Sequence, residues 1–462
     1  MSQRKEPLQS AGKRPQVVIV GAGFGGINAA RALGNLPVDV TVIDRRNHHT
    51  FQPLLYQVAL AVLSPAEIAQ PIRGILAKNQ NTEVLMDEVT GIDTQGRAID
   101  LASGDRIKYD YLILATGATH SYFGKDDWAK LAPGLKSIED ATEMRRRILL
   151  AFELAERHMQ EHGWHPPLNF VVIGGGPTGV ELAGAIGDIS REYLKHDFRH
   201  IDPAKSRVIL LDGGESVLGT YPPELSARAG EALARHGVEV RTRNRVTNVG
   251  PGWVETQNAK GTERIPAVVT LWAAGVQASS LGKLLGTPLD RRGCVIVDGE
   301  MNPPGLEDVF VIGDLAHFEQ DGAQIPGVAQ PAIQMGQHAA RLIEADLEGK
   351  PRTPFHYFDK GDMATIGRLA AVANVKWPFK SKMSGFSAWI AWLLIHVYFI
   401  IGFRNRLSVL WSWVWTYFTF SRSARLITGD THLPGWEEQI AAGNAQMGAE
   451  GAVAAQHVPP HA

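Results

Sequence analysis

The sequence is poor in cysteine and in net charge. Its single cysteine, Cys294, cannot form an intrachain disulfide, a redox-active pair or a cysteine metal cluster. The apolar residues around it indicate an inert buried thiol, and we expect no metal site. A formal charge of -2 argues against a nucleic-acid-binding surface. The N-terminus has no apolar run typical of a secretory signal, so we expect the protein in the cytoplasm or at its membrane face.

Glycine, by contrast, is in excess. The chain has 48 glycines in 462 residues, or about one in ten, whereas about 7% is usual. Part of this excess lies in two loops of the same pattern, about 150 residues apart. The length suggests two or three domains, and the repeated loop indicates that two of them are of one kind.

The first loop follows a β-branched run at residues 17–20, which is typical of a buried parallel strand. Gly21 permits the tight turn, Gly23 lets backbone N–H groups approach a pyrophosphate, and Gly26 lets the following helix pack closely on the strand. Asp44 ends the next strand, 18 residues beyond Gly26, where a carboxylate would accept ribose hydroxyls. These residues predict a dinucleotide site.

The second loop carries Gly174, Gly176 and Gly179 after another apolar strand. Its candidate acid, Asp212, lies 33 residues beyond Gly179, longer than the usual spacing of about 20. We attribute the excess to a longer helix and connector, and Asp212 could also be a simple turn residue. Two glycines follow Asp212 and no arginine is there to hold a 2′-phosphate, which favours NADH over NADPH.

Two more apolar strands run into glycine turns, at Thr116 and at Asp314. Ligands of parallel sheets bind at the carboxyl edge, so both residues are candidate cofactor contacts. Asp314 could also be a helix N-cap, which is compatible with that role. Two dinucleotide sites in one chain suit one bound flavin and one exchanging nicotinamide.

The C-terminal region changes in composition. Residues 386–403 are almost wholly apolar or aromatic; as a helix these 18 residues would be about 27 Å long, close to the bilayer core of about 30 Å. Residues 407–420 then interleave tryptophans with serine and threonine, as in an interfacial belt. We favour a segment that lies on the membrane; a single spanning helix and a buried core or dimer helix stay open.

We therefore predict an α/β protein with two Rossmann-like dinucleotide-binding domains, the second inserted in the first, plus a C-terminal helical membrane-associating segment. The expected boundaries, in chain order, are the FAD-binding domain's first part (15–125), a connector (126–165), the NADH-binding domain (166–285), the FAD-binding domain's second part (286–350), the membrane-associating domain (351–430) and a disordered tail (431–462).

Several segments together resemble the type II NADH:quinone oxidoreductases, a family of flavoproteins with two dinucleotide-binding domains. The resemblance covers residues 15 to about 429. The glycine motifs are common to the whole superfamily, whereas the AQPAIQMG run and the aromatic C-terminus are much more specific. The segments that carry it are residues 21–26 with Asp44, 51–59, 115–117, 174–184, 311–314, 329–336 and 401–407.

The resemblance implies two cofactor sites. It assigns FAD to Gly21, Gly23, Gly26, Asp44, Thr116 and Asp314. It assigns NADH to Gly174, Gly176, Gly179 and Asp212, where the family more often has glutamate.

The resemblance also implies the chemistry and its setting. Glu181 would sit near the nicotinamide and flavin rings and handle the proton that accompanies hydride transfer. Gln330 and Gln334 would lie beside the flavin at the quinone end, and their i, i+4 spacing puts both amides on one helix face; a face of routine hydrogen bonds is the other interpretation. We expect a respiratory, non-proton-pumping enzyme that passes hydride from NADH to FAD and two electrons to a membrane quinone, as a homodimer on the cytoplasmic face of the inner membrane.

Two rival functions remain at this point. A soluble NAD(P)H-dependent ferredoxin or rubredoxin reductase would share both glycine loops but has no need of the apolar C-terminus. A flavoprotein resembling apoptosis-inducing factors would need a basic surface for DNA, which the near-neutral charge disfavours. The single cysteine makes disulfide reductases and sulfide:quinone oxidoreductases improbable.

Overall fold

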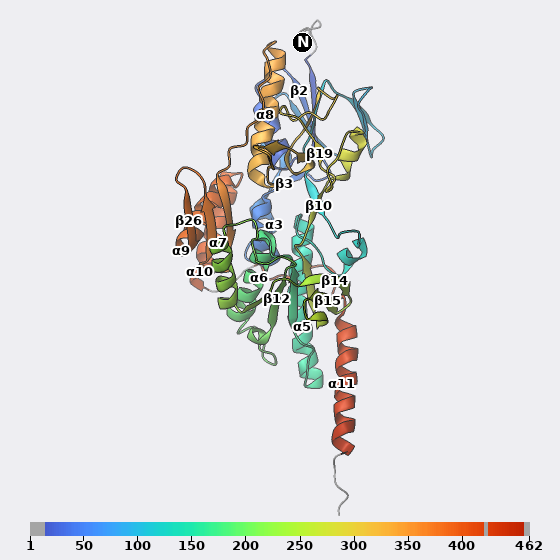
Figure 1. Ribbon diagram of the computed structural model, residues 1–462, viewed down its shortest axis with the longest axis vertical. Helices are drawn as coiled ribbons and strands as arrows, with labels where there is room; N and C mark the ends of the chain where they lie inside the picture. Colours follow the sequence, from blue (N-terminus) through green and yellow to red (C-terminus); the bar gives the residue numbers. More distant parts are fainter. Residues whose placement is uncertain (1–13, 420–423, 457–462) are drawn as a thin grey trace, which may run out of the picture. The chain divides into compact units, whose positions relative to one another are not determined.

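The computed structural model describes residues 14–419 and 424–456, except for the side chains of Tyr417 and of residues 448–456 (Figure 1). The chain forms two compact units. The first comprises the chain up to Phe51 together with Ala69–His120 and Val276–Asp359. The second comprises Gln52–Ile68, Ser121–Gly275 and the chain from Lys360 onward. Residues 52–68, which we assigned to the FAD-binding domain, thus belong to the second unit.

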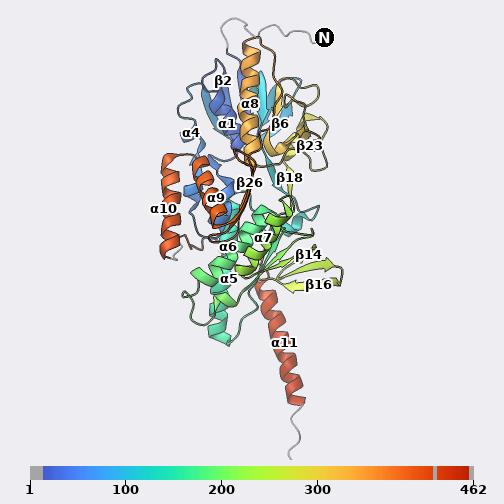
Figure 2. The ribbon, with the colours of Figure 1, turned by 60° about the vertical axis from the view of Figure 1, so that its left-hand side comes forward.

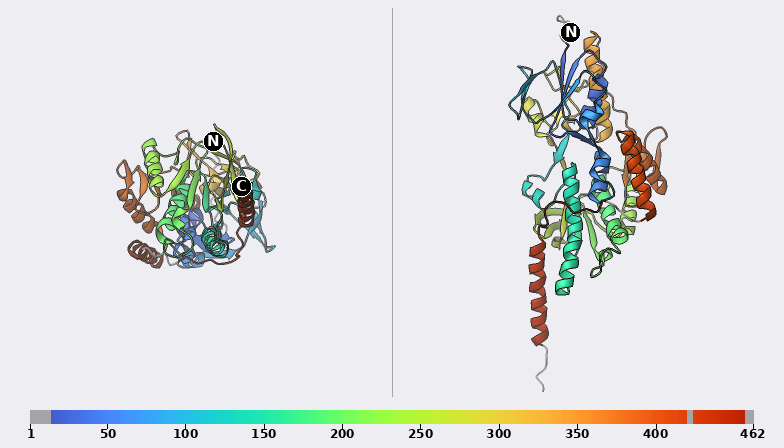
Figure 3. Two further views of the ribbon diagram at one scale, coloured as in Figure 1. Left: turned by 90° about the horizontal axis from the view of Figure 1, so that it is seen from below. Right: turned by 180° about the vertical axis from the view of Figure 1, so that it is seen from behind.

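The first unit is built on a five-stranded parallel sheet in the order β20-β9-β1-β2-β5. β20 pairs with β9 although the whole second glycine loop lies between them in sequence, so the predicted insertion of one dinucleotide domain in the other is confirmed. Helices α1 and α8 lie side by side (Figure 3, right). The strands and helices are β1 (Gln16–Val20), α1 (Phe24–Leu33), β2 (Asp39–Asp44), β5 (Thr82–Met86), β9 (Tyr111–Leu114), β20 (Val309–Val311) and α8 (Ala329–Leu347).

Smaller elements complete the first unit. Val17, Val18 and Ile19 of the central strand are fully buried, as the β-branched run predicted. The remaining elements are β3 (His48–Thr50), β4 (Ala69–Pro71), α4 (Ile72–Ile75), β6 (Val89–Asp93), β7 (Ala98–Leu101), β8 (Arg106–Lys108), β10 (Ala118–His120), β18 (Val276–Ala278), η5 (Ser280–Leu285), β19 (Val295–Ile296), η6 (Gly313–Leu315), β21 (Ala316–His317), β22 (Glu319–Gln320) and β23 (Ala323–Gln324).

The second unit repeats the same design with a four-stranded parallel sheet in the order β13-β12-β11-β17. The long stretch before Asp212 is explained, because α6 continues into a π-helical segment, η3, and a further short helix, η4. Its elements are α5 (Ile138–His162), β11 (Asn169–Ile173), α6 (Pro177–Asp188), η3 (Ile189–Tyr193), η4 (Pro203–Lys205), β12 (Arg207–Leu211), α7 (Pro223–Arg235), β13 (Val238–Arg241), β14 (Arg245–Gly250), β15 (Trp253–Asn258), β16 (Gly261–Pro266) and β17 (Val269–Trp272).

Helix α5 has clear start and stop signals. Ser137 and Asp140 form a capping box at its N-terminus, and Gly163 ends it in the left-handed conformation with φ 74°. The second unit also contains η1 (Gln52–Leu54), α2 (Leu55–Ala59), α3 (Pro65–Ile68) and η2 (Asp126–Lys130).

The C-terminal region forms an antiparallel sheet followed by two helices (Figure 2). The elements are β24 (Gly361–Thr365), β25 (Ala371–Val375), β26 (Ser381–Gly385), α9 (Phe386–Phe399) and α10 (Phe403–Thr419). The apolar run at 386–403 is therefore interrupted after 14 residues, about 21 Å of helix against a bilayer core of about 30 Å. Within residues 14–419 and 424–456, no helix has the length and apolarity needed to cross a membrane.

The expectation of a disordered tail is wrong for part of its length, because α11 spans Trp436–Gln456. Alanine is the strongest helix former, and Glu437 and Glu438 in the first turn complement the helix dipole. The start of the helix is anchored, since the Gln439 side chain donates to the carbonyl of Gly252 at 2.9 Å. Residues 457–462 lie outside the described part of the chain.

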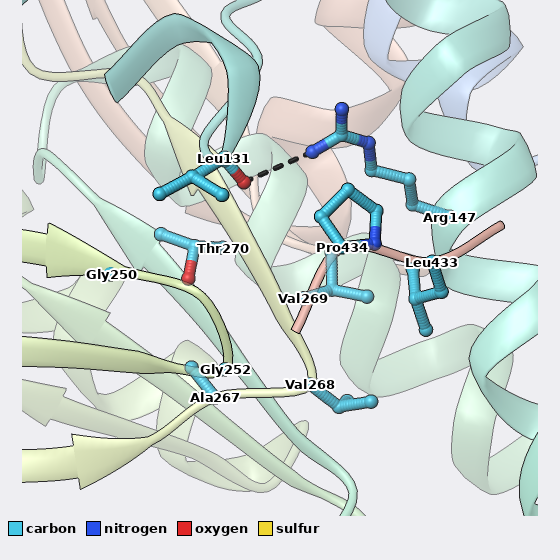
Figure 4. A pocket seen from close by; sticks show the side chains of 10 residues that line it. All are labelled: Leu131, Arg147, Gly250, Gly252, Ala267, Val268, Val269, Thr270, Leu433 and Pro434. Atoms are coloured by element: carbon cyan, nitrogen blue, oxygen red, sulfur yellow. Dashed lines mark hydrogen bonds between the residues drawn. The ribbon is translucent and has the colours of Figure 1, made fainter. Parts of the chain in front are cut away.

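The segment before α11 is held against the rest of the second unit by arginines of α5. Arg146 donates to the carbonyls of Asp430 and His432, both at 2.8 Å. Leu433 and Pro434 then help to line a small cavity next to β17, where Arg147 reaches the carbonyl of Leu131 (Figure 4). This cavity lies where the segment before α11 packs against α5 and β17, and neither glycine loop lines it.

Candidate functional site

The glycines of the first loop each have a separate steric reason. Gly21 has φ +98°, and a Cβ there would stand 2.6 Å from the carbonyl oxygen of Ala115. A Cβ on Gly26 would stand 1.8 Å from the carbonyl oxygen of Gly21. A Cβ on Gly23 would meet nothing within 4 Å, so this side of the loop is open. The loop is thus closed where it packs on the protein and open where a pyrophosphate would approach.

Asp44 closes the first loop from the next strand. One carboxylate oxygen accepts from the backbone N–H of Ala22 at 2.7 Å, and the other from that of Arg46 at 2.8 Å. A carboxylate has about four acceptor positions, so capacity remains for ribose hydroxyls. His49 was missed by the sequence reasoning; its Nδ1 donates to the carbonyl of Ala22 at 2.9 Å. Burial lowers the pKa of His49, so its ring stays neutral. The ring therefore supports the loop without placing a positive charge there.

The first unit offers features that suit FAD. Helix α1 begins at Gly23 without a side-chain cap and without an acid in its first turn, so its N-terminal N–H groups can bind an anion. The buried hydroxyl of Thr116 has no hydrogen-bond partner among the described residues. Thr116 and Asp314 follow β9 and β20, which are adjacent in the sheet. The residues present therefore fit a dinucleotide with hydroxyl groups.

Asp314 is not a helix N-cap. It lies inside the short helix η6, and Ile312 takes the cap position. Gly327 approaches it from the loop before α8, where a Cβ would stand 3.4 Å from the Asp314 carboxyl carbon. The turn at Gly313, with φ +69°, determines the position of the Asp314 carboxylate.

The second loop places its three glycines under the same steric constraints as the first. Gly174 has φ +110°, a Cβ on Gly179 would stand 1.8 Å from the carbonyl oxygen of Gly174, and a Cβ on Gly176 would meet nothing within 4 Å. Asp212 accepts from the N–H of Gly175 at 2.5 Å and from that of Gly214 at 2.6 Å. Asp212 is thus also a turn residue, and the turn it closes places it beside the open loop.

Glu181 lies in the first turns of α6, next to the second loop, and is half-buried. Loss of water around its carboxyl raises its pKa to about 8, although a hydrogen bond from the backbone N–H of Thr365 opposes the rise. Tyr221 faces the same region, and its pKa is raised by burial and by the negative charges of Asp362 and Glu181. A carboxyl that titrates near neutral pH can take up and release a proton during turnover.

Gln330 and Gln334 both lie on α8, as the spacing predicted, and both are half-buried. Gln334 holds the backbone of Phe358, donating to its carbonyl at 3.0 Å and accepting from its N–H at 2.9 Å. Its amide thereby makes the routine hydrogen bonds that were the other interpretation of this helix face. Gln334 therefore holds the last segment of the first unit, just before Asp359.

Gly336 lets α8 approach α1, since a Cβ there would stand 2.2 Å from the carbonyl oxygen of Gly25. We expect Gly336→Ala to destabilise the protein by about 3 kcal/mol, because backbone would have to move. Thermal unfolding of both proteins measures this. The matched control is Gly230→Ala on α7, where a Cβ meets nothing within 4 Å; it should be neutral or gain up to about 1 kcal/mol from helix propensity. An unchanged Tm for Gly336→Ala would contradict this account.

Cys294 is buried, and its thiol donates to the carbonyl of Asp314 at 3.5 Å. Burial raises the pKa of the thiol to about 11, so the reactive thiolate is scarce at neutral pH. The predicted burial of this thiol is confirmed.

Helices α9 and α10 expose a large apolar surface. Trp389, Trp392 and Trp413 face inward and are buried. Outward-facing side chains on both helices are large and apolar, and exposed apolar side chains that gather on a surface mark interaction sites. We call this set the apolar face: Phe386, Ile390, Leu394, Ile395 and Tyr398 of α9, and Phe403, Leu407, Trp411, Val414, Trp415 and Phe418 of α10.

Known proteins are similar to this chain in sequence and in fold. The family model described as pyridine nucleotide-disulphide oxidoreductase matches residues 15–336. The chain is 44% identical over 439 residues to the type II NADH:quinone oxidoreductase Ndh of Mycobacterium tuberculosis, with 93% of each chain covered. It is 29% identical over 442 residues to the mitochondrial internal alternative NAD(P)H-ubiquinone oxidoreductase A1 of Arabidopsis thaliana, covering 89% of this chain and 85% of the relative. The solved structure of NDH2 from Plasmodium falciparum in complex with NADH superposes with a TM-score of 0.79 at 19% identity, covering 90% of this chain and 100% of that one.

Proposed function

The chain belongs to the type II NADH:quinone oxidoreductases, within the pyridine nucleotide-disulphide oxidoreductase family, and we infer that it oxidises NADH through FAD and reduces a quinone. The observation that carries this function is the pair of glycine loops, which share one geometry but lie in different units. One loop suits a resident flavin and the other an exchanging nicotinamide. Bound FAD would supply the two-electron chemistry that links NADH to the quinone.

We propose that the first loop binds FAD. Gly21 and Gly26 shape the loop, and Gly23 leaves room for the pyrophosphate at the N-terminus of α1. Asp44 would accept ribose hydroxyls, while Thr116 and Asp314 would hold hydroxyl groups further along the cofactor. The support is the open space at Gly23 and the hydroxyl of Thr116, which has no hydrogen-bond partner within the described part of the chain.

We propose that Gly174, Gly176 and Gly179 bind the NADH pyrophosphate in the same way, with Asp212 on the ribose. Glu181 would hold the proton that accompanies hydride transfer, since its pKa lies near the working pH. Gln330 would contact the cofactor or quinone. For Gln334 we propose a positioning role at the same end of α8, because its amide is bound to Phe358.

Anaerobic mixing tests the overall function. NADH should bleach the flavin of the detergent-solubilised protein, and a soluble ubiquinone or menaquinone analogue should restore its colour. Bleaching without recovery would keep the flavoprotein but move the acceptor to a protein partner, as in ferredoxin reductases. A failure of NADH to bleach the flavin would contradict the role of the second loop.

We propose that the apolar face docks on the cytoplasmic side of a membrane, and that the enzyme works there as a homodimer. The support for docking is the exposure of Phe418, at 82%, and of Phe403, at 75%, on one helix. Large aromatic side chains exposed to this degree favour the membrane interface.

Charges on the apolar face should release the protein from membranes. We expect the double variant Leu394→Glu/Trp411→Glu to bind vesicles of mixed neutral and anionic lipid at least about 100-fold more weakly, because two apolar side chains are lost and two negative charges gained. Cosedimentation measures the binding. The control Met86→Glu/Phe123→Glu changes two side chains that are also highly exposed, at 65% and 69%, but lie outside this face. Equal retention of both variants would argue against docking through α9 and α10.

A further inference from the structure

A buried chain of hydrogen bonds runs from helix α10 to strand β24. The indole N–H of Trp413 donates to the amide oxygen of Gln57 at 2.6 Å. The amide nitrogen of Gln57 donates to the hydroxyl of Tyr56 at 2.8 Å, and that hydroxyl lies 2.9 Å from the hydroxyl of Thr365. All four side chains are buried, none more than 7% exposed.

These contacts form one connected unit. They join residues separated by 356 and 309 positions in sequence, all within the second unit of the fold. Both ends of the Gln57 amide are used, one toward α10 and the other toward β24. A buried polar group left without a partner costs about 1–3 kcal/mol, so loss of one hydrogen bond leaves the neighbouring group unsatisfied. A displacement at one end of this network therefore alters the hydrogen bonds along it.

The far end of this chain reaches Glu181. Helix α6, which carries Glu181, packs against β24, and the backbone N–H of Thr365 lowers the pKa of the Glu181 carboxyl. The hydroxyl of Thr365 in turn lies 2.9 Å from that of Tyr56. A donated hydrogen bond favours the ionised carboxylate. The position of Thr365 therefore affects the pKa of Glu181, the residue that would hold the proton in the proposed function.

The other end of the network is Trp413 on α10, the helix that carries about half of the apolar face. Apart from Trp413, polar contacts to α3 seat α10: the hydroxyls of Ser408 and Ser412 donate to Glu67 at 2.9 and 2.5 Å. Trp411 and Trp415, on either side of Trp413, are 64% and 49% exposed. One helix therefore combines an outward apolar surface with an inward hydrogen bond to Gln57.

We propose that Tyr56 and Gln57 are positioning residues that transmit the seating of α10 to Thr365 and so to Glu181. The inference rests on the proposed role of Glu181. Docking of the apolar face would then set the protonation of the acid, so that the membrane-bound enzyme and the free enzyme differ in their response to pH.

Few ionisable groups face Glu181. Tyr221 interacts with it directly, and Asp362 of β24 acts on Tyr221 in turn. Tyr56 is the ionisable group of α2. At the other end of α6, Asp188 pairs with His236 at the end of α7. The test below leaves the charge of Tyr221, Asp362, Asp188 and His236 unchanged.

The test compares Tyr56→Phe and Trp413→Phe with the control Thr419→Val, all in the FAD-loaded full-length protein. Both test variants keep an aromatic ring; Trp413→Phe removes the hydrogen bond to Gln57, and Tyr56→Phe removes the hydrogen bonds to Gln57 and to Thr365. The control removes a hydroxyl of α10 that donates to the carbonyl of Trp415 in its own helix. Hydrogen exchange of the β24 amides and the pH profile of NADH:quinone turnover are measured with and without vesicles of neutral and anionic lipid.

We expect the β24 amides to exchange roughly two- to tenfold faster in both test variants, because at least one hydrogen bond of the network is lost in each. We expect the apparent pKa of turnover to rise by about half a unit to one unit, because the donor to Glu181 is less well held. In the wild type, addition of vesicles should move the pKa; in the test variants that response should be smaller. Thr419→Val should behave as the wild type in every measurement.

Two results would overturn the proposal in distinguishable ways. If Glu181→Gln abolishes the pKa but Tyr56→Phe and Trp413→Phe leave it where Thr419→Val does, the network is structural only and transmission is wrong. If Glu181→Gln itself leaves the pH profile unchanged, the acid role of Glu181 is wrong and the proposal falls with it. Faster exchange together with a raised pKa would support it.

Discussion

Glu181→Gln should lower kcat for NADH:quinone turnover about 100-fold while FAD stays bound, because general acid–base catalysis typically contributes 10²–10⁴-fold. Glutamine keeps the shape and accepts the hydrogen bond from Thr365, but it cannot exchange a proton. The wild-type pH profile should contain a titration near the Glu181 pKa of about 8, and the variant should lack it. Stopped-flow flavin reduction and steady-state turnover across pH measure both effects.

The same substitution that lowers kcat should raise the stability of the folded protein at high pH. The folded-state pKa of Glu181 lies above its ordinary value of 4.5, so the folded protein binds this proton more tightly than the unfolded chain. The stability it contributes is complete below about pH 4.5 and is lost as pH rises through about 8. Glu181→Gln should therefore be more stable than the wild type at and above pH 8, and the difference should vanish toward pH 4.5. Melting curves across this range measure it.

A matched control separates this effect from loss of any carboxylate. Glu231→Gln on α7 removes an exposed acid whose partner is the nearby Arg228, and should leave both profiles within error of the wild type. Full turnover by Glu181→Gln with FAD bound would exclude the proton role. Low turnover without a change in pH dependence would assign Glu181 to binding instead.

Gly23→Ala and Gly26→Ala should fail in different ways although the residues are three apart. At Gly26 a Cβ would stand 1.8 Å from the backbone of Gly21, so the substitution should destabilise even the FAD-free chain by about 3 kcal/mol or more. At Gly23 a Cβ meets no atom of the described residues within 4 Å, so the FAD-free chain should melt within about 0.5 kcal/mol of the wild type. Its methyl group would instead occupy the approach of the pyrophosphate.

We expect Gly23→Ala to weaken FAD binding about 10- to 100-fold, because one hydrogen bond to a charged phosphate is lost at about 1.5–3 kcal/mol. Flavin fluorescence during titration of the apoprotein measures Kd, and thermal melts measure stability. The parallel variant Gly176→Ala should retain FAD and raise KM for NADH by a similar factor. If Gly23→Ala bound FAD as tightly as the wild type, the pyrophosphate would have to lie elsewhere.

Much of the fold follows from local pattern alone. The β-branched strands, the two glycine loops and the acids that end the next strands predicted two dinucleotide domains, and the return of the chain at residues 309–312 indicated the insertion. These signals are readable because a glycine that avoids a backbone clash and a strand buried on both faces each constrain residues close in sequence. The resemblance to one family then supplied Glu181, Gln330 and Gln334, which no local pattern singles out by itself.

Other features depend on contacts between residues far apart in sequence, and only the tertiary structure decides them. Composition could not show that residues 52–68 belong to the second unit, that Gln334 is bound to Phe358, or that His49 supports the first loop. The aromatic C-terminus predicted an interfacial surface, but its division into α9 and α10 and the inward turn of Trp413 toward Gln57 arise from packing. Periodicity records which face of a segment is apolar; which partner covers that face, and which polar atoms must then pair, is determined when the chain closes on itself.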